Sequence, residues 1–401
     1  MKKVYIVAAK RTAIGKFGGS LAGFSASDLG AAVIKNIIEN TQIDPAAIDE
    51  VIVGNILSAG QGQGVGRQCA IKAGIPVEVP AYSLNMVCGS GMKSVSNAFI
   101  SIQAGMSDLV LAGGTENMSQ ASMLLPHTVR NGVKMGNFTV MDHMITDGLW
   151  DAYNDYHMGN TAENIAEKYN ISREEQDKFA ADSQIKAAKA QDAGNFDKEI
   201  VPINIVTKKE TIVFDKDEYI NRSTNLEKLS ALRPAFKKDG TVTAGNASGI
   251  NDGASFVLVA SEDALKKYNL TPLVEIVAVG QGGVDPKIMG MGPVPAIKNA
   301  LKNANLKLTD IEVLELNEAF AAQSLGVIKQ LCRDHGVDIK FFEEKCNKNG
   351  GAIALGHPIG ASGNRIIVTL IHEMKRSNNT YGLASLCIGG GMGTAIILKN
   401  V

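Results

Sequence analysis

The stretch Ile43-Asp44-Pro45-Ala46-Ala47-Ile48-Asp49-Glu50-Val51-Ile52-Val53-Gly54 combines a short acidic turn with an apolar strand, and residues 29–35 open a helix before it. The same order returns much later, where residues 296–301 open a helix and residues 306–317 supply the turn and the strand. This repetition predicts two copies of one α/β unit, and therefore two similar halves that face each other. Ligand sites in such sheets lie where strand ends meet loops, so we expect catalytic residues from both halves.

A cysteine lies at a strand-to-helix turn in the first half. Residues 82–87 predict a short buried strand, and Cys88-Gly89-Ser90-Gly91 forms the turn. The following residues place apolar side chains at helical spacing until about Gly105, at Met92, Val95, Phe99 and Ile102. The positive end of the helix dipole favours a thiolate, so Cys88 is well placed as a nucleophile. The alternative is a small buried hydrophobe in a tight turn, which is the commoner role of a free cysteine.

The second half carries three further polar groups at loop positions. His357 lies on the glycine-lined loop 350–363, which opens another helix, and Cys387 precedes a glycine cluster at 389–393. Asn317 follows the apolar strand 313–316. A reactive cysteine needs a base, and a carbon acid needs a proton acceptor and a cradle for its enolate. These residues and Cys88 could together supply all of those roles.

Five motifs occur along the chain in the order found in one family, and their residues are 4–15, 113–119, 245–249, 317–320 and the glycine-rich end. On these motifs the sequence resembles the thiolase family over nearly its whole length, and specifically the biosynthetic acetyl-CoA acetyltransferase type. The resemblance implies an α/β thiolase fold of two similar halves in five layers, helix–sheet–helix–sheet–helix, with an inserted loop domain. It implies an N-terminal half at 1–120 plus 250–270, a loop domain at 121–249 and a C-terminal half at 271–401. The loop domain would carry coenzyme A (CoA) and oligomer contacts, and a capping box at Ser172 and Glu175 predicts a helix there up to about Gln191.

The resemblance also implies a catalytic role for each residue that matches a family motif. Cys88 resembles the acyl-carrying nucleophile, His357 the base that activates it, and Cys387 the second thiol, which moves a proton at the substrate α-carbon. Asn317 would hold a water that, with His357, stabilises the enolate oxygen. The backbone N–H groups of Cys88 and Gly389 would form an oxyanion hole for the tetrahedral state of acyl transfer.

Further residues match the family's contacts to the thioester and to CoA. His157 and Met158 match a His-Met-Gly element near the thioester, and Ser248 matches a hydroxyl that contacts the pantetheine arm. Met289 and Phe320 resemble pocket walls, although plain core packing explains them nearly as well. Arg222 stands one place later than the family's arginine beside the adenosine phosphate.

The composition excludes several classes of partner. Charged residues are 20% of the 401 residues and the net charge is −1, so no overall field recruits nucleic acid or an anionic membrane. The five scattered cysteines form neither a disulfide framework nor a zinc pattern, and no apolar run reaches the length of a membrane span. We therefore expect a cytoplasmic enzyme without metal or cofactor. Its substrates would be acetyl-CoA, acetoacetyl-CoA and CoA, and the family suggests a homotetramer.

Four alternatives come from other readings of the same features. A thiolase of broader chain length, acting on 3-ketoacyl-CoA, shares every motif. A non-catalytic acyl-CoA or lipid-binding relative is disfavoured by the presence of both thiols, His357 and Asn317. A nucleotide-binding oxidoreductase is suggested by the glycines at 389–393, but only eight residues follow Gly393, which leaves no helix and no acidic ribose contact. A decarboxylating ketoacyl synthase shares the fold but typically uses two histidines beside one cysteine.

Overall fold

The computed structural model describes residues 2–401, and its centre is one mixed sheet. The N-terminal half contributes β4 (Ala81–Leu84), β3 (Glu50–Gly54), β5 (Leu109–Asn117), β13 (Asn251–Ser261) and β1 (Val4–Thr12), in that order. The C-terminal half continues it with β14 (Val274–Gly283), β17 (Met392–Asn400), β16 (Tyr381–Ile388) and β15 (Val313–Leu316). The two halves join where Tyr5 and Ile6 of β1 pair antiparallel with Glu275 and Val274 of β14.

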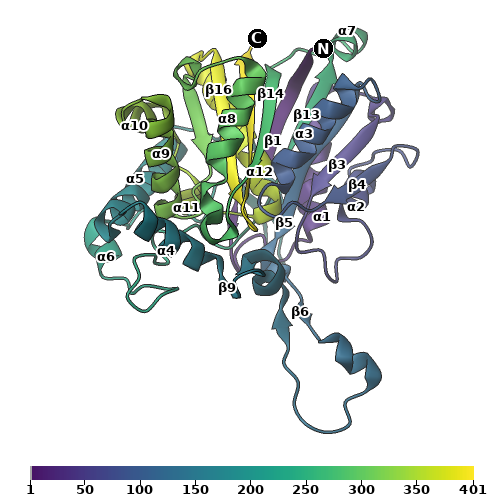
Figure 1. The fold of residues 1–401 in the computed structure, drawn as a ribbon. Coiled ribbons are helices and arrows are strands. Elements are labelled where there is room, and N and C mark those ends of the chain that lie inside the picture. Colours follow the sequence, from purple (N-terminus) through teal and green to yellow (C-terminus); the bar gives the residue numbers. More distant parts are fainter. Residues whose placement is uncertain (1) are drawn as a thin grey trace.

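Helices cover both faces of each half and create five layers (Figure 1). Their bounds are α1 Ala26–Thr41, α2 Val65–Lys72, α3 Ser90–Gln103, α8 Pro293–Ala304, α9 Ala321–His335 and α12 Ile359–Ser377. Helices α1 and α2 pack on the outer face of the N-terminal strands, and α8 and α9 pack on the outer face of the C-terminal strands. Helices α3 and α12 lie between the halves and share one apolar cluster with the inner faces of both.

Strand burial follows from this layering. Successive side chains of a strand point to opposite faces, and helices cover both faces here. Phe256 of β13 therefore contacts the outer cluster while its neighbour Val257 contacts the inner one, and every residue of β13 is buried.

The predicted repeat is confirmed. In the first half α1 leads through a 3₁₀ turn at Pro45–Ala47 to β3, and in the second half α8 leads through a 3₁₀ turn at Leu308–Asp310 to β15. Both strands then pair in parallel, β3 with β5 and β15 with β16. The predicted strand 313–316 coincides with β15.

Two glycines allow the central helices α3 and α12 to touch at the level of their backbones. A Cβ on Gly91 would lie 2.8 Å from the nitrogen of Asn364 and 2.9 Å from the oxygen of Gly360. A Cβ on Gly363 would lie 2.5 Å from the nitrogen of Met92. Since both helices begin a few residues after a predicted catalytic residue, this contact places the first turns of the two halves against each other.

The prediction of a buried strand at residues 82–87 is wrong in extent and in burial. Strand β4 ends at Leu84, and its residues are half-buried or exposed, with Tyr82 39% exposed. The physical reason is position, because β4 is the last strand of the sheet and pairs only with β3.

Shorter elements connect the strands of the two halves. They are β2 (Gly15–Lys16), η2 (Met118–Gln120), α7 (Glu262–Lys267), η5 (Pro286–Met291), α10 (Lys340–Lys345) and α11 (Ala352–Leu355). Within residues 2–401, no helix is long and apolar enough to cross a bilayer.

The region between β5 and β13 contains three α-helices and three two-stranded hairpins. Its elements are β6 (Met123–Leu124), η3 (His127–Asn131), β7 (Met141–Asp142), η4 (Met144–Leu149), β8 (Trp150–Asp151), β9 (Tyr156–His157), α4 (Met158–Lys168), α5 (Arg173–Asp192), β10 (Ile200–Val201), β11 (Ile203–Val206), β12 (Thr211–Phe214) and α6 (Leu226–Ser230). Of the hairpins, β6–β7 and β11–β12 project from the body. The predicted capping box is confirmed, because Ser172 and Glu175 exchange side-chain and backbone hydrogen bonds at the start of α5.

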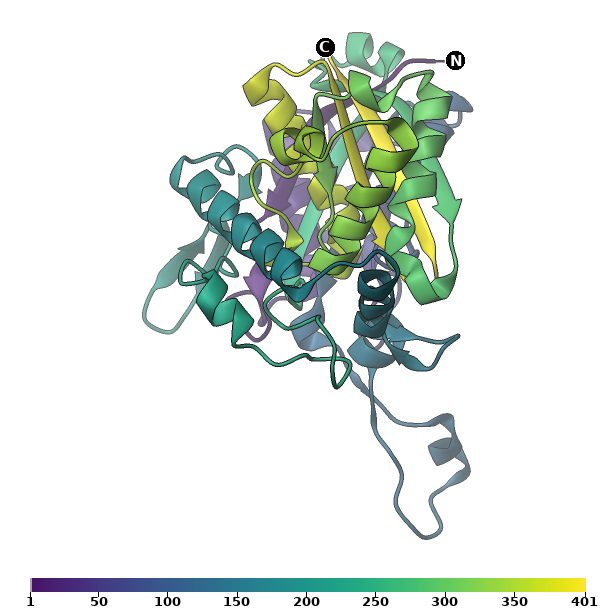
Figure 2. The same cartoon turned by 60° about the vertical axis from the view of Figure 1, so that its left-hand side comes forward.

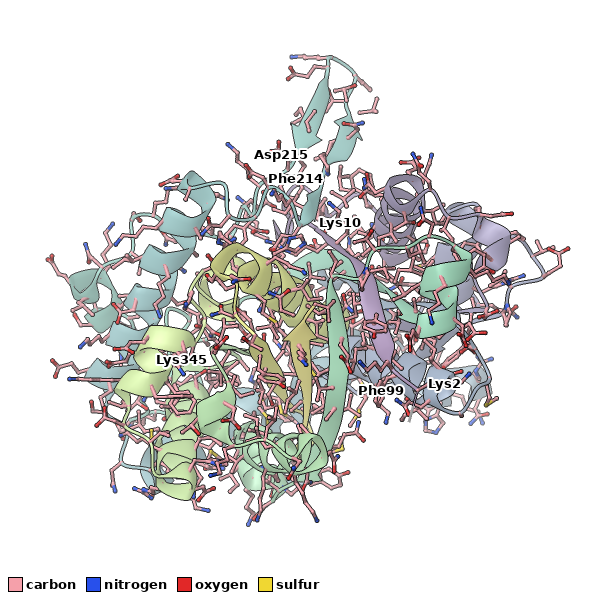
Figure 3. The ribbon with its side chains drawn as sticks, turned by 90° about the horizontal axis from the view of Figure 1, so that it is seen from above. Lys2, Lys10, Phe99, Phe214, Asp215 and Lys345 are labelled. Atoms are coloured by element: carbon pink, nitrogen blue, oxygen red, sulfur yellow. The ribbon has the colours of Figure 1, made fainter. Side chains whose placement is uncertain are left out.

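The figures show where the two hairpins point. The segment around β6 forms a long arm that leaves the body at the end opposite the chain termini (Figures 1 and 2). The β11–β12 hairpin is a separate projection, and the labels of Phe214 and Asp215 mark its base (Figure 3).

Candidate active site

One cavity of about 570 Å³ gathers most of the predicted site residues. Its walls include Cys88, His157, Met158, Ser248, Met289, Phe320, His357, Cys387 and Gly389. These residues come from both halves and from the region between β5 and β13, as the repeat predicted for a site at strand ends.

Cys88 lies in a strained elbow between β4 and α3. The preceding residue, Val87, has φ of 45°, a left-handed conformation that a β-branched residue rarely adopts. Ser90 holds the elbow, since its hydroxyl accepts a hydrogen bond from the N–H of Met86 and donates one to the carbonyl of Val87. The elbow places the thiol immediately before α3, at the wall of the cavity.

The N–H groups around the Cys88 sulfur favour its thiolate, in the direction expected of a helix start, but burial has the larger effect on the pKa. Burial raises the pKa of the Cys88 thiol to about 11, and the backbone N–H groups of Gly389 and of Cys88 itself lower it only in part. Removal of the sulfur from water therefore outweighs the helix dipole and the N–H groups. Cys88 is a thiol at neutral pH and needs a base to become a nucleophile.

His357 lies on the loop between α11 and α12. Gly356 before it has φ of +106°, and the N–H of His357 donates to the Asn251 side chain at 2.9 Å. Burial and, secondarily, the nearby Arg365 guanidinium lower the pKa of His357 to about 4. The imidazole is therefore neutral at physiological pH and able to accept a proton.

Cys387 and Asn317 lie at the ends of neighbouring strands. Cys387 is in β16 and is 1% exposed, and burial together with the adjacent Cys88 raises the pKa of its thiol. Asn317 follows β15, and its backbone N–H donates to Ser385 of β16 at 3.0 Å. Both amide atoms of the Asn317 side chain are buried without a protein hydrogen-bond partner among residues 2–401. Such atoms favour a bound water or ligand oxygen.

His157 closes the cavity on the side of α4. Its Nδ1 accepts the N–H of Gly159 at 3.0 Å, so in the neutral ring the proton is on Nε2. The ring stacks on Phe236 with centroids 4.6 Å apart, and Phe236 meets Phe320 edge to face at 6.2 Å. These contacts hold a hydrogen-bond donor on a rigid aromatic wall.

The structure does not bring Arg222 into this cavity. Its guanidinium pairs with the Asp192 carboxylate at 2.7 Å and 2.9 Å and also donates to Gln191. Arg222 lines a neighbouring cavity of about 520 Å³ instead, which shares Lys16 and Tyr219 with the first one.

Sequence reasoning missed a further set of residues that line the main cavity. They are Lys16, Phe17, Met118, Leu149, Tyr219, Phe236, Ile250 and Ile359. Met118 and Ile359 lie within the motif 113–119 and the loop 350–363, whose matches could have drawn attention to them. Most of the others come from loops without a periodic pattern, so only the cavity itself identifies them. No group of three or more His, Cys, Asp or Glu side chains in residues 2–401 is arranged to hold a metal ion.

Comparison with known proteins identifies the family. The model for the N-terminal domain of thiolase matches residues 4–263, and the model for the C-terminal domain of thiolase matches residues 270–400. The chain belongs to the thiolase family. This thiolase is an acyltransferase, and it has the two-halved fold of its family.

Three relatives show how close the similarity is. The thiolase is 55% identical over 401 residues to a probable acetyl-CoA acyltransferase of Staphylococcus aureus (strain COL), with both chains covered completely. The crystal structure of the Bacillus anthracis acetyl-CoA acetyltransferase superposes with a TM-score of 0.95 at 43% identity, covering 100% of this chain and 99% of that one. Human mitochondrial 3-ketoacyl-CoA thiolase in complex with CoA superposes with a TM-score of 0.92 at 46% identity, covering 100% and 98%. The relatives thus include a protein named as an acetyl-CoA acetyltransferase and a protein named as a 3-ketoacyl-CoA thiolase.

Proposed function

We propose that this thiolase is an acetyl-CoA C-acetyltransferase, which condenses two acetyl-CoA into acetoacetyl-CoA and CoA and catalyses the reverse thiolysis. The observation that carries the proposal is the meeting of two thiols, Cys88 and Cys387, with the neutral imidazole of His357 in one cavity. Asn317 is not among the residues that line this cavity, and its buried amide is unpartnered at the end of β15. The CoA thioesters are substrates, and the proposed chemistry uses no other cofactor.

In the first half-reaction Cys88 takes the acetyl group. His357 accepts the proton of the Cys88 thiol, and the thiolate attacks the thioester carbonyl. The oxyanion forms beside the N–H groups of Cys88 and Gly389, which face the Cys88 sulfur. Collapse releases the CoA thiolate, which takes the proton from His357, and leaves acetyl-Cys88.

In the second half-reaction a carbon–carbon bond forms. His357, neutral again, takes the proton of the Cys387 thiol, and the resulting thiolate removes a proton from the α-carbon of the second acetyl-CoA. The enolate oxygen is stabilised by His357 and by a water on the Asn317 amide. The enolate carbon attacks acetyl-Cys88 and forms acetoacetyl-CoA. The Cys88 thiolate that leaves takes the proton held by His357, and Cys387 keeps the proton removed from the α-carbon.

A thiolase acting on longer 3-ketoacyl-CoA substrates is the second candidate. The similarity to human mitochondrial 3-ketoacyl-CoA thiolase supports it, as do the apolar cavity walls, which include Phe17, Met118, Leu149 and Met289. Thiolysis of acetoacetyl-CoA and of a longer 3-ketoacyl-CoA discriminates the two. We expect kcat/KM to favour acetoacetyl-CoA, whereas a preference for the longer substrate would support the second candidate.

We further propose that the segment 121–249 acts as the loop domain between an N-terminal half at 1–120 plus 250–270 and a C-terminal half at 271–401. His157 and Met158 would contact the thioester, and Ser248 would contact the pantetheine arm. Arg222 would reach the adenosine phosphate only after giving up its ion pair with Asp192.

We propose a cytoplasmic location, which the five free cysteines support.

A homotetramer is proposed from the projecting arm. Its exposed side chains are unusually apolar, namely Met123, Leu125, Val133, Met135, Phe138, Val140 and Met141. An exposed apolar surface of this kind typically marks a protein interface, and a second copy of the chain is the partner that we propose.

Labelling of the two thiols tests the chemistry. Incubation with acetyl-CoA should leave an acetyl group on Cys88, and Cys88→Ser should lose most turnover. Cys387→Ala should still take up the acetyl group but fail to form or cleave the carbon–carbon bond and to exchange α-protons with solvent. Undiminished acetylation in Cys88→Ala would refute the assignment of the nucleophile. Binding of acetyl-CoA without acetylation of the wild type would favour a non-catalytic acyl-CoA-binding protein.

A further inference from the structure

A buried serine contacts the ring of the proposed base. Ser362 lies in the first turn of α12, and its Oγ is 2.5 Å from Nδ1 of His357. Both residues are buried, with exposed fractions of 6% for His357 and 1% for Ser362. The contact lies on the side of the imidazole opposite Nε2.

The second hydrogen bond of the Ser362 hydroxyl shows which atom donates the proton in its contact with His357. The Ser362 hydroxyl donates to the carbonyl of Pro358 at 2.9 Å. A hydroxyl has one proton and two lone pairs, so while it donates to Pro358 it can only accept from His357. Nδ1 of His357 therefore carries the ring proton, and Nε2 keeps its lone pair.

We propose that Ser362 is a positioning residue that selects the tautomer of His357 in which Nε2 is the base toward Cys88. This inference rests on the proposed function. During acylation the proton of the Cys88 thiol moves to Nε2, while the Nδ1–H bond to Ser362 stays in place. The Ser362 oxygen goes on accepting from the Nδ1–H of the imidazolium, so the histidine gains and returns a proton at Nε2 without rotating.

The partner of Nδ1 is a neutral hydroxyl rather than a carboxylate, which has a chemical consequence. A carboxylate would stabilise the imidazolium and retain the proton. The hydroxyl orients the ring and leaves the His357 pKa low, so the proton is readily returned to the departing thiolate. The bond from Asn251 to the backbone of His357 holds the loop independently, so loss of the Ser362 hydroxyl should release the ring and not the loop.

The test compares Ser362→Ala and Ser362→Thr with a matched control. Ser96 is also buried and also donates to a helix carbonyl four residues earlier, that of Met92 at 3.1 Å, but its hydroxyl contacts no catalytic group that we propose. We expect Ser362→Ala to slow acetylation of Cys88 about 10- to 100-fold, part of the 10²- to 10⁴-fold that a general base contributes, with little change in KM. Ser362→Thr, which keeps the hydroxyl, should recover most of the rate, and Ser96→Ala should match the wild type.

Nitrogen-15 NMR of histidine-labelled protein reads the tautomer directly, with His357→Ala used to assign the signal among six histidines. The wild type should show His357 protonated at Nδ1, and Ser362→Ala should shift the ring toward the Nε2-protonated form. An Nε2-protonated ring in a wild type that acetylates Cys88 normally, or full acetylation by Ser362→Ala, would overturn the inference. Failure of the wild type to acetylate Cys88 would instead refute the proposed function, and the NMR signal would still decide whether Ser362 selects the tautomer.

Discussion

Substitution of Gly91 by alanine should destabilise the fold and slow the reaction together. In an isolated helix this change stabilises by about 1 kcal/mol. Here the new Cβ would lie 2.8 Å from the nitrogen of Asn364 and 2.9 Å from the oxygen of Gly360, both of which are backbone atoms of α12. Ordinary contact begins at 3.4 Å, so the helices must separate by 3.4 − 2.8 = 0.6 Å. Overpacking of this kind costs about 1–3 kcal/mol, which exceeds the gain in helix propensity.

A separation of α3 from α12 would also change the geometry of the active site. Gly91 follows Cys88 by three residues and Gly360 follows His357 by three, so a shift of α3 against α12 moves the thiol relative to the imidazole. A misplacement of about 1 Å can cost about 100-fold in rate, so we expect about a tenfold loss of kcat for Gly91→Ala.

Urea unfolding and thiolysis of acetoacetyl-CoA measure the two effects. Gly23→Ala is the control, because its Cβ would meet nothing within 4 Å and its φ is ordinary. The control should keep full activity and equal or slightly greater stability. If Gly91→Ala were as stable and as active as Gly23→Ala, the backbone contact between α3 and α12 would not hold the two catalytic residues in place.

Three further predictions follow from the buried groups and from the arm. Because burial raises the Cys88 pKa to about 11, its alkylation by iodoacetamide should accelerate about tenfold per pH unit from pH 7 to 9; a rate that levels off in this range would show a preformed thiolate. Arg11→Met should lower the free energy of unfolding by about 3–5 kcal/mol, because it strands the buried carboxylates of Glu199 and Asp217, which its guanidinium contacts at 2.6–2.9 Å. Lys35→Met, which removes an exposed pair, should cost no more than about 0.5 kcal/mol, and an equal loss in both variants would contradict the argument. Met135→Asp combined with Phe138→Asp in the arm should reduce the mass measured by light scattering to that of a smaller assembly, whereas an unchanged mass would place the contact elsewhere.

Local patterns were the successful part of sequence reasoning. Helical spacing and a capping box located α3 and α5, and the repeated helix–turn–strand unit predicted the two halves. The cavity residues were found because each belongs to a motif of the family, as with His157 and Met158. Phe236, which stacks on His157, belongs to no such motif and became visible only in the folded chain.

The sequence by itself determined which chemistry is available, because residue types and their order along the chain carry it. Two thiols, an imidazole and an amide at loop positions can be recognised without coordinates. Only the tertiary structure decided the protonation states of these groups. Burial is a property of the whole fold, and it opposes the helix dipole at Cys88 strongly enough to keep the thiol protonated. The tertiary structure also decided the hydrogen-bond partners of these side chains. The contact of Ser362 with the His357 ring and the ion pair of Asp192 with Arg222 depend on distances that only folding sets.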